Sequence, residues 1–174
     1  MISTTRRTLI GAAIAAIGSA VLFDRFAGEP AEAAGKPAAA DEIFPVTHTD
    51  EEWKRMLDPG AYQVLRHEGT ERPYTSPLND EHRTGLFACA GCALPLFSSK
   101  TKFDSRTGWP SFWQPLDKQA VIEHRDTTFG MVRTEVKCRQ CGGHLGHVFD
   151  DGPKPTGLRY CMNGVAMTFK PASA

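Results

Sequence analysis

The sequence has no excess of charge of either sign and no long hydrophobic run. Lysine plus arginine and aspartate plus glutamate both number 20, so the chain has no overall field to attract nucleic acid or an anionic membrane. The uncharged tract from Leu9 to Phe23 is shorter than the roughly 20 residues that a helix needs to cross a bilayer. We therefore expect no nucleic-acid partner, and no membrane partner for the mature form.

Signals for long helices are also scarce. The 174 residues include 12 prolines and 16 glycines, which predict many turns and short strands. Hydrophobic residues make up 41% and charged residues 23%, a balance typical of globular rather than disordered chains. Even after removal of a leader, the length suffices for one domain with its own core.

Residues 1–33 have the pattern of an export signal. Arg6-Arg7 precede the uncharged tract, and Ala31-Glu32-Ala33 offers small residues at the usual cleavage spacing. The twin arginine followed by Thr8-Leu9 resembles the signal that exports folded proteins, a route that lets thiolates bind metal before they reach the oxidising periplasm. An uncleaved anchor or a general secretory signal is the alternative. We expect a periplasmic or otherwise exported protein after cleavage.

The remaining chain divides into a linker, one domain and a short tail. Residues 34–48 are rich in Ala, Lys and Pro and are expected to form the linker, residues 49–171 the domain, and residues 172–174 the tail. Thr49 with Glu52 fits a capping box at the start of a short helix. Asp58-Pro59 fits the cap and first position of a second helix, which ends at Gly69.

The rest of the domain is expected to consist of strands. The clearest candidates are 85–88, 121–124 and 131–136, where side chains partly alternate and turn residues follow. Further strands are expected at 147–149 and between 158 and 169. The predicted class is therefore mainly antiparallel β, with the two short helices packed on the outside.

Four of the five cysteines form two Cys-x-x-Cys pairs, Cys89/Cys92 and Cys138/Cys141. Each such turn places two sulfurs on one side of a tight knuckle, and two knuckles supply a closed tetrahedral set for one Zn²⁺. A closed set leaves no position for water, so the metal would be structural. The alternatives are redox disulfides within the motifs, disulfides between them, or an iron site. Neither motif has the βαβ context of a redox fold, which favours zinc.

The fifth cysteine, Cys161, lies in the run Arg159-Tyr160-Cys161-Met162-Asn163. In extended backbone Arg159, Cys161 and Asn163 point to the same side. A cation beside a thiol lowers its pKa and raises the fraction of thiolate, which is the nucleophile. We therefore predict that Cys161 is a catalytic nucleophile.

Two histidines directly follow the second knuckle, in the spacing His144-x-x-His147. Additional zinc ligation or a plain surface position would explain them. Four cysteines already complete a zinc shell, however, and histidine is the natural proton donor or acceptor near neutral pH. We interpret both as candidate proton-transfer residues.

Three further residues have a structural alternative beside their functional interpretation. Asp151 precedes Gly-Pro and fits ordinary turn chemistry as well as a place in the site. Asn163 precedes glycine, and Asn-Gly is the strongest short hairpin signal. Trp109 belongs to a cluster of aromatics that is typical of a core, but its position between Gly and Pro suits an indole that lines a pocket.

The runs that carry these residues resemble the methionine-R-sulfoxide reductase family, B type. They are Thr107-Gly108-Trp109-Pro110-Ser111-Phe112, His144-Leu145-Gly146-His147-Val148-Phe149, Asp151-Gly152-Pro153 and Arg159-Tyr160-Cys161-Met162-Asn163. The paired knuckles match the zinc-bearing branch, and residues 50–53 and 69–73 match the family's N-terminal region. The resemblance covers about residues 49–171.

The resemblance implies reduction of the R epimer of methionine sulfoxide in proteins or peptides. It also implies a β-rich fold of two antiparallel sheets with zinc at the end away from the active site. Cys161 would attack the substrate sulfur and become a sulfenic acid, while Trp109 supplies an apolar wall for the substrate methyl. The positions that match the family's site are Trp109, His144, His147, Asp151, Arg159, Cys161 and Asn163.

Two positions depart from the family pattern. Many members carry a second cysteine at the position of Thr107, which forms a disulfide with the nucleophile, and a serine is common at Gly164. All other cysteines here are assigned to zinc, so we expect an external thiol reductant, either a thioredoxin-like protein or a small thiol. We expect a monomer. A non-catalytic zinc-binding module and a peroxide-reducing thiol enzyme are the alternative functions.

Overall fold

The computed structural model describes residues 43–173, apart from the side chain of Phe129. The predicted export signal, the predicted linker up to residue 42 and the last residue of the tail lie outside the described residues. Residues 43–48 contact the domain, since the Val46 amide donates to the Gln140 carbonyl at 2.9 Å. Within residues 43–173 no helix is both long enough and apolar enough to span a membrane.

The described residues form two α-helices, α1 (Asp50–Met56) and α2 (Pro59–His67). Their strands are β1 (Gly85–Cys89), β2 (Pro95–Ser98), β3 (Lys102–Phe103), β4 (Ser111–Phe112), β5 (Val121–Asp126), β6 (Arg133–Cys138), β7 (His144–Phe149), β8 (Arg159–Met162) and β9 (Met167–Pro171). Single turns of 3₁₀ helix are η1 (Pro77–Asp80), η2 (Ser99–Thr101), η3 (Lys118–Ala120), η4 (Thr128–Gly130) and η5 (Gly164–Ala166).

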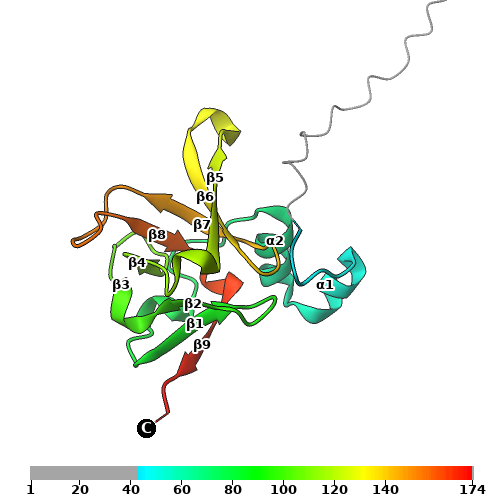
Figure 1. The fold of residues 1–174 in the computed structure, drawn as a ribbon, viewed down its shortest axis with the longest axis horizontal. Helices are drawn as coiled ribbons and strands as arrows, with labels where there is room; N and C mark the ends of the chain where they lie inside the picture. The colour runs from blue at the N-terminus through cyan, green and yellow to red at the C-terminus, as the bar shows by residue number, and fades with distance from the viewer. Residues whose placement is uncertain (1–42, 174) are drawn as a thin grey trace, which may run out of the picture. The chain divides into compact units, whose positions relative to one another are not determined.

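The strands make two antiparallel sheets, as the family resemblance implied. The larger has the order β3-β4-β8-β7-β6-β5 and the smaller β2-β1-β9 (Figure 1). Aromatic side chains from both sheets meet in the core, where the Phe97 and Phe112 rings stack at 4.4 Å and Phe87 meets Phe112 edge-on at 4.9 Å. These three side chains are fully buried, and each contributes about 1.5–3 kcal/mol of transfer free energy.

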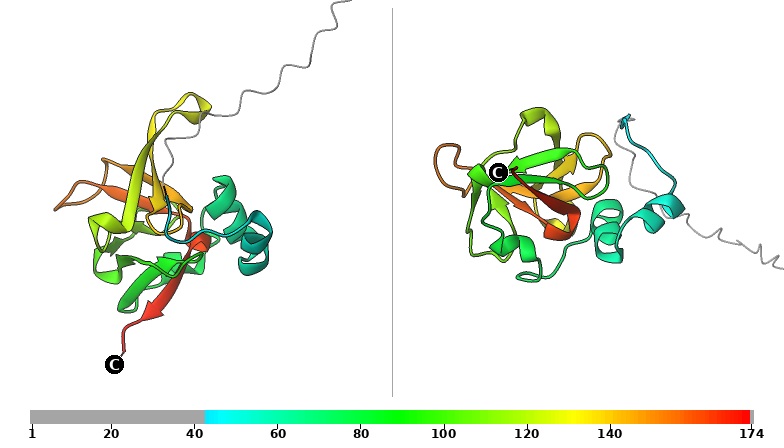
Figure 2. Two further views of the ribbon diagram at one scale, coloured as in Figure 1. Left: turned by 45° about the vertical axis from the view of Figure 1, so that its right-hand side comes forward. Right: turned by 90° about the horizontal axis from the view of Figure 1, so that it is seen from below.

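Both predicted helices are present and lie together at one side of the domain (Figures 1 and 2). Thr49 and Glu52 form the expected reciprocal capping box at the start of α1. Helix α2 begins at Pro59 and ends before Glu68, which adopts the left-handed conformation and lets the Gly69 amide reach the Gln63 carbonyl at 3.0 Å. The prediction of two short outer helices is confirmed.

Two details of the strand prediction were wrong, and one alternative interpretation does not hold. Strand β6 begins at Arg133 rather than residue 131, and Met131 and Val132 are exposed on the β5–β6 hairpin, which extends beyond its neighbours (Figures 1 and 2). Strands β2, β3 and β4 were not predicted, because they are short and lack alternation. Asn163-Gly164 closes no hairpin, since β8 and β9 belong to different sheets and η5 separates them.

The pleat of β8 decides which side chains reach the site. Tyr160 and Met162 point into the core and are buried, so Cys161 between them faces the opposite side of the six-stranded sheet. Its cross-strand partners are His147 on β7 and Ser111 on β4. The sheet therefore places a thiol, an imidazole and a hydroxyl in one row.

Candidate active site and metal site

A small pocket of about 140 Å³ opens at Cys161. It brings together four of the predicted site residues, Cys161, Trp109, His147 and Asn163. The remaining lining residues are Thr70, Arg133, Gly146 and Phe149. A larger hollow of about 870 Å³ beside β1, β2 and β9 is lined by no cysteine, histidine or carboxylate, so the chemistry points to the smaller one.

Cys161 is half-buried, and burial raises the pKa of its thiol. The Thr107 hydroxyl at 3.8 Å from the sulfur and the positive charge of Arg159 act in the opposite direction. The sequence predicted the sign of the Arg159 effect, but burial outweighs it. At neutral pH the resting group is therefore mainly a thiol rather than a thiolate.

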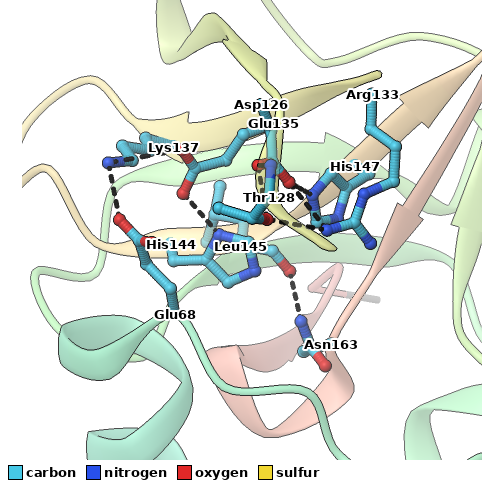
Figure 3. Close-up of polar contacts among 10 residues, drawn as sticks. All are labelled: Glu68, Asp126, Thr128, Arg133, Glu135, Lys137, His144, Leu145, His147 and Asn163. Atoms are coloured by element: carbon cyan, nitrogen blue, oxygen red, sulfur yellow. Dashed lines mark hydrogen bonds and ion pairs between the residues drawn. The ribbon is translucent and has the colours of Figure 1, made fainter. Parts of the chain in front are cut away.

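His147 is hydrogen-bonded to the end of β5, where the turn of the β5–β6 hairpin begins (Figure 3). Its Nε2 lies 3.0 Å from the Asp126 carboxylate, which also accepts from the Arg133 guanidinium at 2.7 Å. Burial lowers the pKa of His147, and the Asp126 hydrogen bond raises it in part. Burial alone would raise the pKa of Asp126, but hydrogen bonds from Thr128, His147 and Arg133 hold it well below its usual range. An ionised Asp126 only accepts, so His147 donates its Nε2–H.

His144 lies behind this pair and outside the pocket lining. Its Nδ1 is 2.7 Å from Glu135, and its ring meets the His147 ring edge-on at 5.4 Å (Figure 3). Burial alone would raise the pKa of Glu135, but the hydrogen bond from His144 and the charge of Lys137 lower it. The structure thus gives each histidine its own carboxylate and brings only His147 to the pocket.

Glu71 joins three parts of the pocket. Its amide donates to the Asn163 side-chain oxygen at 3.0 Å, and its carbonyl accepts from the Trp109 indole at 3.1 Å. Its carboxylate accepts from the backbone amides of Gly164 and Val165. Burial raises the pKa of this carboxyl, and the two amides oppose the shift. The side-chain NH₂ of Asn163 donates to the Leu145 carbonyl at 3.1 Å, so both the oxygen and the nitrogen of this side chain are held by hydrogen bonds.

Arg159 and Asp151 form a bidentate pair outside the pocket lining. Arg159 Nε and a terminal guanidinium nitrogen each donate to one Asp151 oxygen at 2.8 Å. The guanidinium lies over the Phe149 ring at 4.4 Å, and Phe149 lines the pocket. Asp151 therefore holds Arg159 in place against a pocket wall rather than meeting the pocket itself.

Sequence reasoning missed several residues that shape this site: Thr70, Glu71, Asp126, Arg133, Glu135, Gly146 and Phe149. Gly146 has a clear reason, because an added Cβ would collide with the Cys161 carbonyl oxygen. Gly164, one of the two departures from the family pattern, also has one. A Cβ at Gly164 would collide with the Ser76 side chain, whose hydroxyl accepts from the Leu78 amide at 3.2 Å.

The four predicted metal ligands cluster as expected. The sulfurs of Cys89, Cys92, Cys138 and Cys141 all lie within 4.8 Å of one another, with pairs at 3.5 and 3.7 Å. Four thiolates at about 2.3 Å from a zinc ion would be about 3.8 Å apart, so this arrangement fits a tetrahedral ion. None of the four lines the pocket at Cys161.

The knuckles have similar backbones. In each, the residue after the second cysteine takes a positive φ, Ala93 at 61° and Gly142 at 69°. The Gly142 amide returns to the Cys138 carbonyl at 2.9 Å, and the Ala93 amide returns to the Cys89 carbonyl at the same distance. These hydrogen bonds close each turn, and the clustered sulfurs show that each turn places its two cysteines on the same side.

Comparison with known proteins gives one consistent result. The SelR domain model matches residues 57–171. Peptide methionine sulfoxide reductase MsrB of Pseudomonas putida (strain W619) is 60% identical over 126 residues, which cover 72% of this chain and 95% of that protein. The proteins of the same name from Agrobacterium fabrum and Thiobacillus denitrificans are each 56% identical, and the match covers 93% of each.

Proposed function

Because the chain belongs to the SelR-domain family of B-type methionine sulfoxide reductases, we propose that it reduces methionine-R-sulfoxide in proteins or peptides through Cys161. The observation that carries this proposal is the pocket itself, where the only cysteine outside the four-sulfur cluster faces Trp109 and His147. Reduction of oxidised methionine restores an apolar side chain, so the activity is one of protein repair.

The pocket offers each group of the substrate a suitable partner. The substrate sulfur carries a methyl and an oxygen, and the Trp109 ring provides an apolar wall for the methyl. The indole is held by the Glu71 carbonyl, so this wall has a fixed position. His147 lines the same pocket and has Nε2 bound to Asp126, which leaves Nδ1 as the ring nitrogen that can take the thiol proton and pass it to the substrate oxygen. Separate partners for the methyl and the oxygen beside Cys161 allow the pocket to distinguish the two epimers of a chiral sulfoxide.

The reaction balances with the thiol as it stands in the resting protein. Cys161 attacks the substrate sulfur, and the oxygen is then transferred to the Cys161 sulfur as the substrate S–O bond breaks, so the thiol and the sulfoxide become a sulfenic acid and a thioether. Cys161 is oxidised by two electrons, and the substrate sulfur is reduced by two. The proton that leaves the Cys161 sulfur is the one the oxygen requires, and His147 is placed to pass it on. His144 and Glu135 support the orientation of His147 from behind.

The four-cysteine cluster fits one structural Zn²⁺ held by Cys89, Cys92, Cys138 and Cys141. When bound, the ion ties the ends of β1 and β6 together and contributes folding free energy rather than chemistry. These cysteines are therefore not available to resolve the sulfenic acid. An external thiol attacks it to give a mixed disulfide and water, and a second thiol releases Cys161. We place this activity outside the cytoplasm on the strength of the predicted leader.

The test is turnover of each sulfoxide epimer with dithiothreitol as the reductant. We expect consumption of the R epimer, a strong preference over the S epimer, and complete loss of turnover in Cys161→Ser, because a hydroxyl is a far weaker nucleophile than a thiolate. Equal use of both epimers would refute the assignment. Consumption of hydrogen peroxide without sulfoxide turnover would indicate the peroxide-reducing alternative.

A further inference from the structure

A chain of three hydroxyl groups ends at the Cys161 sulfur. Ser111 Oγ lies 2.7 Å from Ser105 Oγ, which lies 2.8 Å from Thr107 Oγ1, and Thr107 Oγ1 lies 3.8 Å from Cys161 Sγ. Ser111 Oγ also donates to the Trp109 carbonyl at 3.1 Å, and because Ser111 lies opposite Cys161 in the sheet, its hydroxyl also acts on the thiol directly and lowers the pKa of Cys161. Ser111 is fully buried, so the chain is screened from solvent where it begins.

The loop that carries Thr107 is fixed on both sides. Arg106 has a positive φ of 58°, and its carbonyl accepts from the Tyr74 hydroxyl at 2.8 Å. The Gly108 carbonyl accepts from the Tyr74 amide at 2.7 Å and from the Asn79 side chain at 2.9 Å. These hydrogen bonds fix the backbone on both sides of Thr107 and so help to keep its hydroxyl beside the Cys161 sulfur.

A chain of hydroxyls can reverse its direction, because each group both donates and accepts. When Cys161 is a thiol, its S–H donates toward Thr107 and the chain runs outward to the Trp109 carbonyl. When Cys161 is a thiolate, Thr107 donates to it, and the bond to that carbonyl is the one lost. A sulfenic acid has an oxygen that can accept a hydrogen bond and an O–H that can donate one. It can therefore bond to Thr107 with the hydroxyl chain running in either direction.

We propose that Thr107, supported by Ser105 and Ser111, is a positioning residue that hydrogen-bonds Cys161 as thiol, thiolate and sulfenic acid and so preserves the sulfenic acid for an external thiol. This rests on the proposed function for the source of the sulfenic acid. A valine at this position would fill the same space without a hydrogen bond. The proposed role therefore depends on the hydrogen bond from the Thr107 hydroxyl and not on the space that the side chain fills.

The first test needs no substrate. The rate of Cys161 alkylation by iodoacetamide is measured against pH in the zinc-loaded protein, in wild type, Thr107→Val and Thr107→Ser. We expect the midpoint to rise by about one pH unit in Thr107→Val, a tenfold loss of thiolate at a given pH, and to return in Thr107→Ser. Ser105→Ala should give a smaller shift in the same direction.

The comparison isolates the hydroxyl, because the charged groups around Cys161 are unchanged in these variants. They are Arg159 on β8, His147 on β7, Arg133 in the pocket wall and Glu71 beneath η5. Thr168→Val provides the matched control, since it removes a hydroxyl from an exposed position on β9. Coincident titrations of wild type and Thr107→Val would overturn the proposal.

The second test follows the sulfenic acid itself. One equivalent of hydrogen peroxide, or of methionine-R-sulfoxide, is added without reductant, and the dimedone adduct on Cys161 is measured by mass spectrometry over time. We expect the sulfenic acid in Thr107→Val to decay about fivefold faster than in wild type and Thr107→Ser. An equal lifetime would refute the role. An effect with peroxide but no adduct with sulfoxide would overturn the proposed function and leave the role of Thr107 supported.

Discussion

Replacement of Asp126 by asparagine tests how the site controls its proton. The carboxylate has no free oxygen: one accepts from the Thr128 amide and hydroxyl at 2.9 and 2.6 Å, and the other from His147 and Arg133 at 3.0 and 2.7 Å. Asparagine keeps one acceptor and gains an NH₂ donor. Whichever way the amide turns, its donor faces the Thr128 amide on one side or the Arg133 guanidinium on the other.

The expected effect follows from the balance at His147. Burial lowers the pKa of this imidazole, and the Asp126 hydrogen bond and charge raise it. Loss of the charge should lower the pKa of His147 by about one further unit, or about 1.4 kcal/mol. If the asparagine NH₂ faces Nε2 of His147, it favours the tautomer with the proton on Nδ1, so Nδ1 can no longer accept the thiol proton. We expect kcat/KM for the R epimer to fall about 10²-fold, at the lower end of what general acid catalysis contributes.

Two measurements check this prediction. NMR titration of the His147 ring gives its pKa in both proteins, and the pH profile of kcat/KM reports the same group during turnover. Asp117→Asn is the matched control, because Asp117 accepts from the Gln119 amide at 2.8 Å as a cap that asparagine forms equally well. An unchanged His147 pKa in Asp126→Asn, with the β5–β6 hairpin still formed, would refute the reasoning.

Three further predictions concern stability. Cys89→Ser should release zinc and lower the Tm by about 10 °C or more, and one zinc retained per chain by atomic absorption would contradict the four-cysteine site. Gly164→Ser should lower the free energy of unfolding, measured with urea, by about 1–3 kcal/mol, because the added side chain collides with Ser76. Adding Ser76→Gly to the same chain should restore part of that stability. If the losses of the two single variants simply add in the double variant, the collision is excluded. Burial raises the folded pKa of Glu71, so the folded state takes up its proton first and stability gains as pH falls through that pKa. Glu71→Gln should lack this gain as the pH falls toward the ordinary glutamate pKa of 4.5. Parallel pH profiles of urea unfolding in the two proteins would refute this prediction.

The parts of the structure that depend on local signals could be predicted from the sequence. The capping box at Thr49 and the proline at the start of α2 each rest on contacts within one helical turn. The two knuckles close through bonds within six residues, so their spacing alone indicates the fold of the turn. Strand alternation also predicted the face of the sheet to which Cys161 points, because residues 159–163 were expected to be extended.

The partners of the site residues could not be predicted, because each is distant in the chain. Glu71 meets Asn163 and Gly164 more than 90 positions later, and no pattern near residue 71 indicates that contact. Asp126 looks like an ordinary residue before a turn, since it does bond Thr128 locally. Only the pairing of β5 with β6, and of β6 with β7, brings that carboxylate to His147.

The spacing His144-x-x-His147 shows most clearly how a local irregularity decides the site. In a regular strand, residues three apart point to opposite faces of the sheet. Here Val136 pairs with Gly146, and the next residue, Lys137, pairs with His144. Strand β7 therefore contains one extra residue, Leu145, at this point. This bulge turns both imidazoles to the face of Cys161.

The same bulge separates the roles of the two histidines. His144 receives its carboxylate from Glu135 within the sheet, whereas His147 receives Asp126 from the end of β5, where the hairpin turn begins. The pocket-lining imidazole is therefore coupled to the hairpin and the buried one is not. A change that shortens the hairpin turn should alter the pKa of His147 and leave the His144–Glu135 pair in place, which NMR titration of the two rings would distinguish.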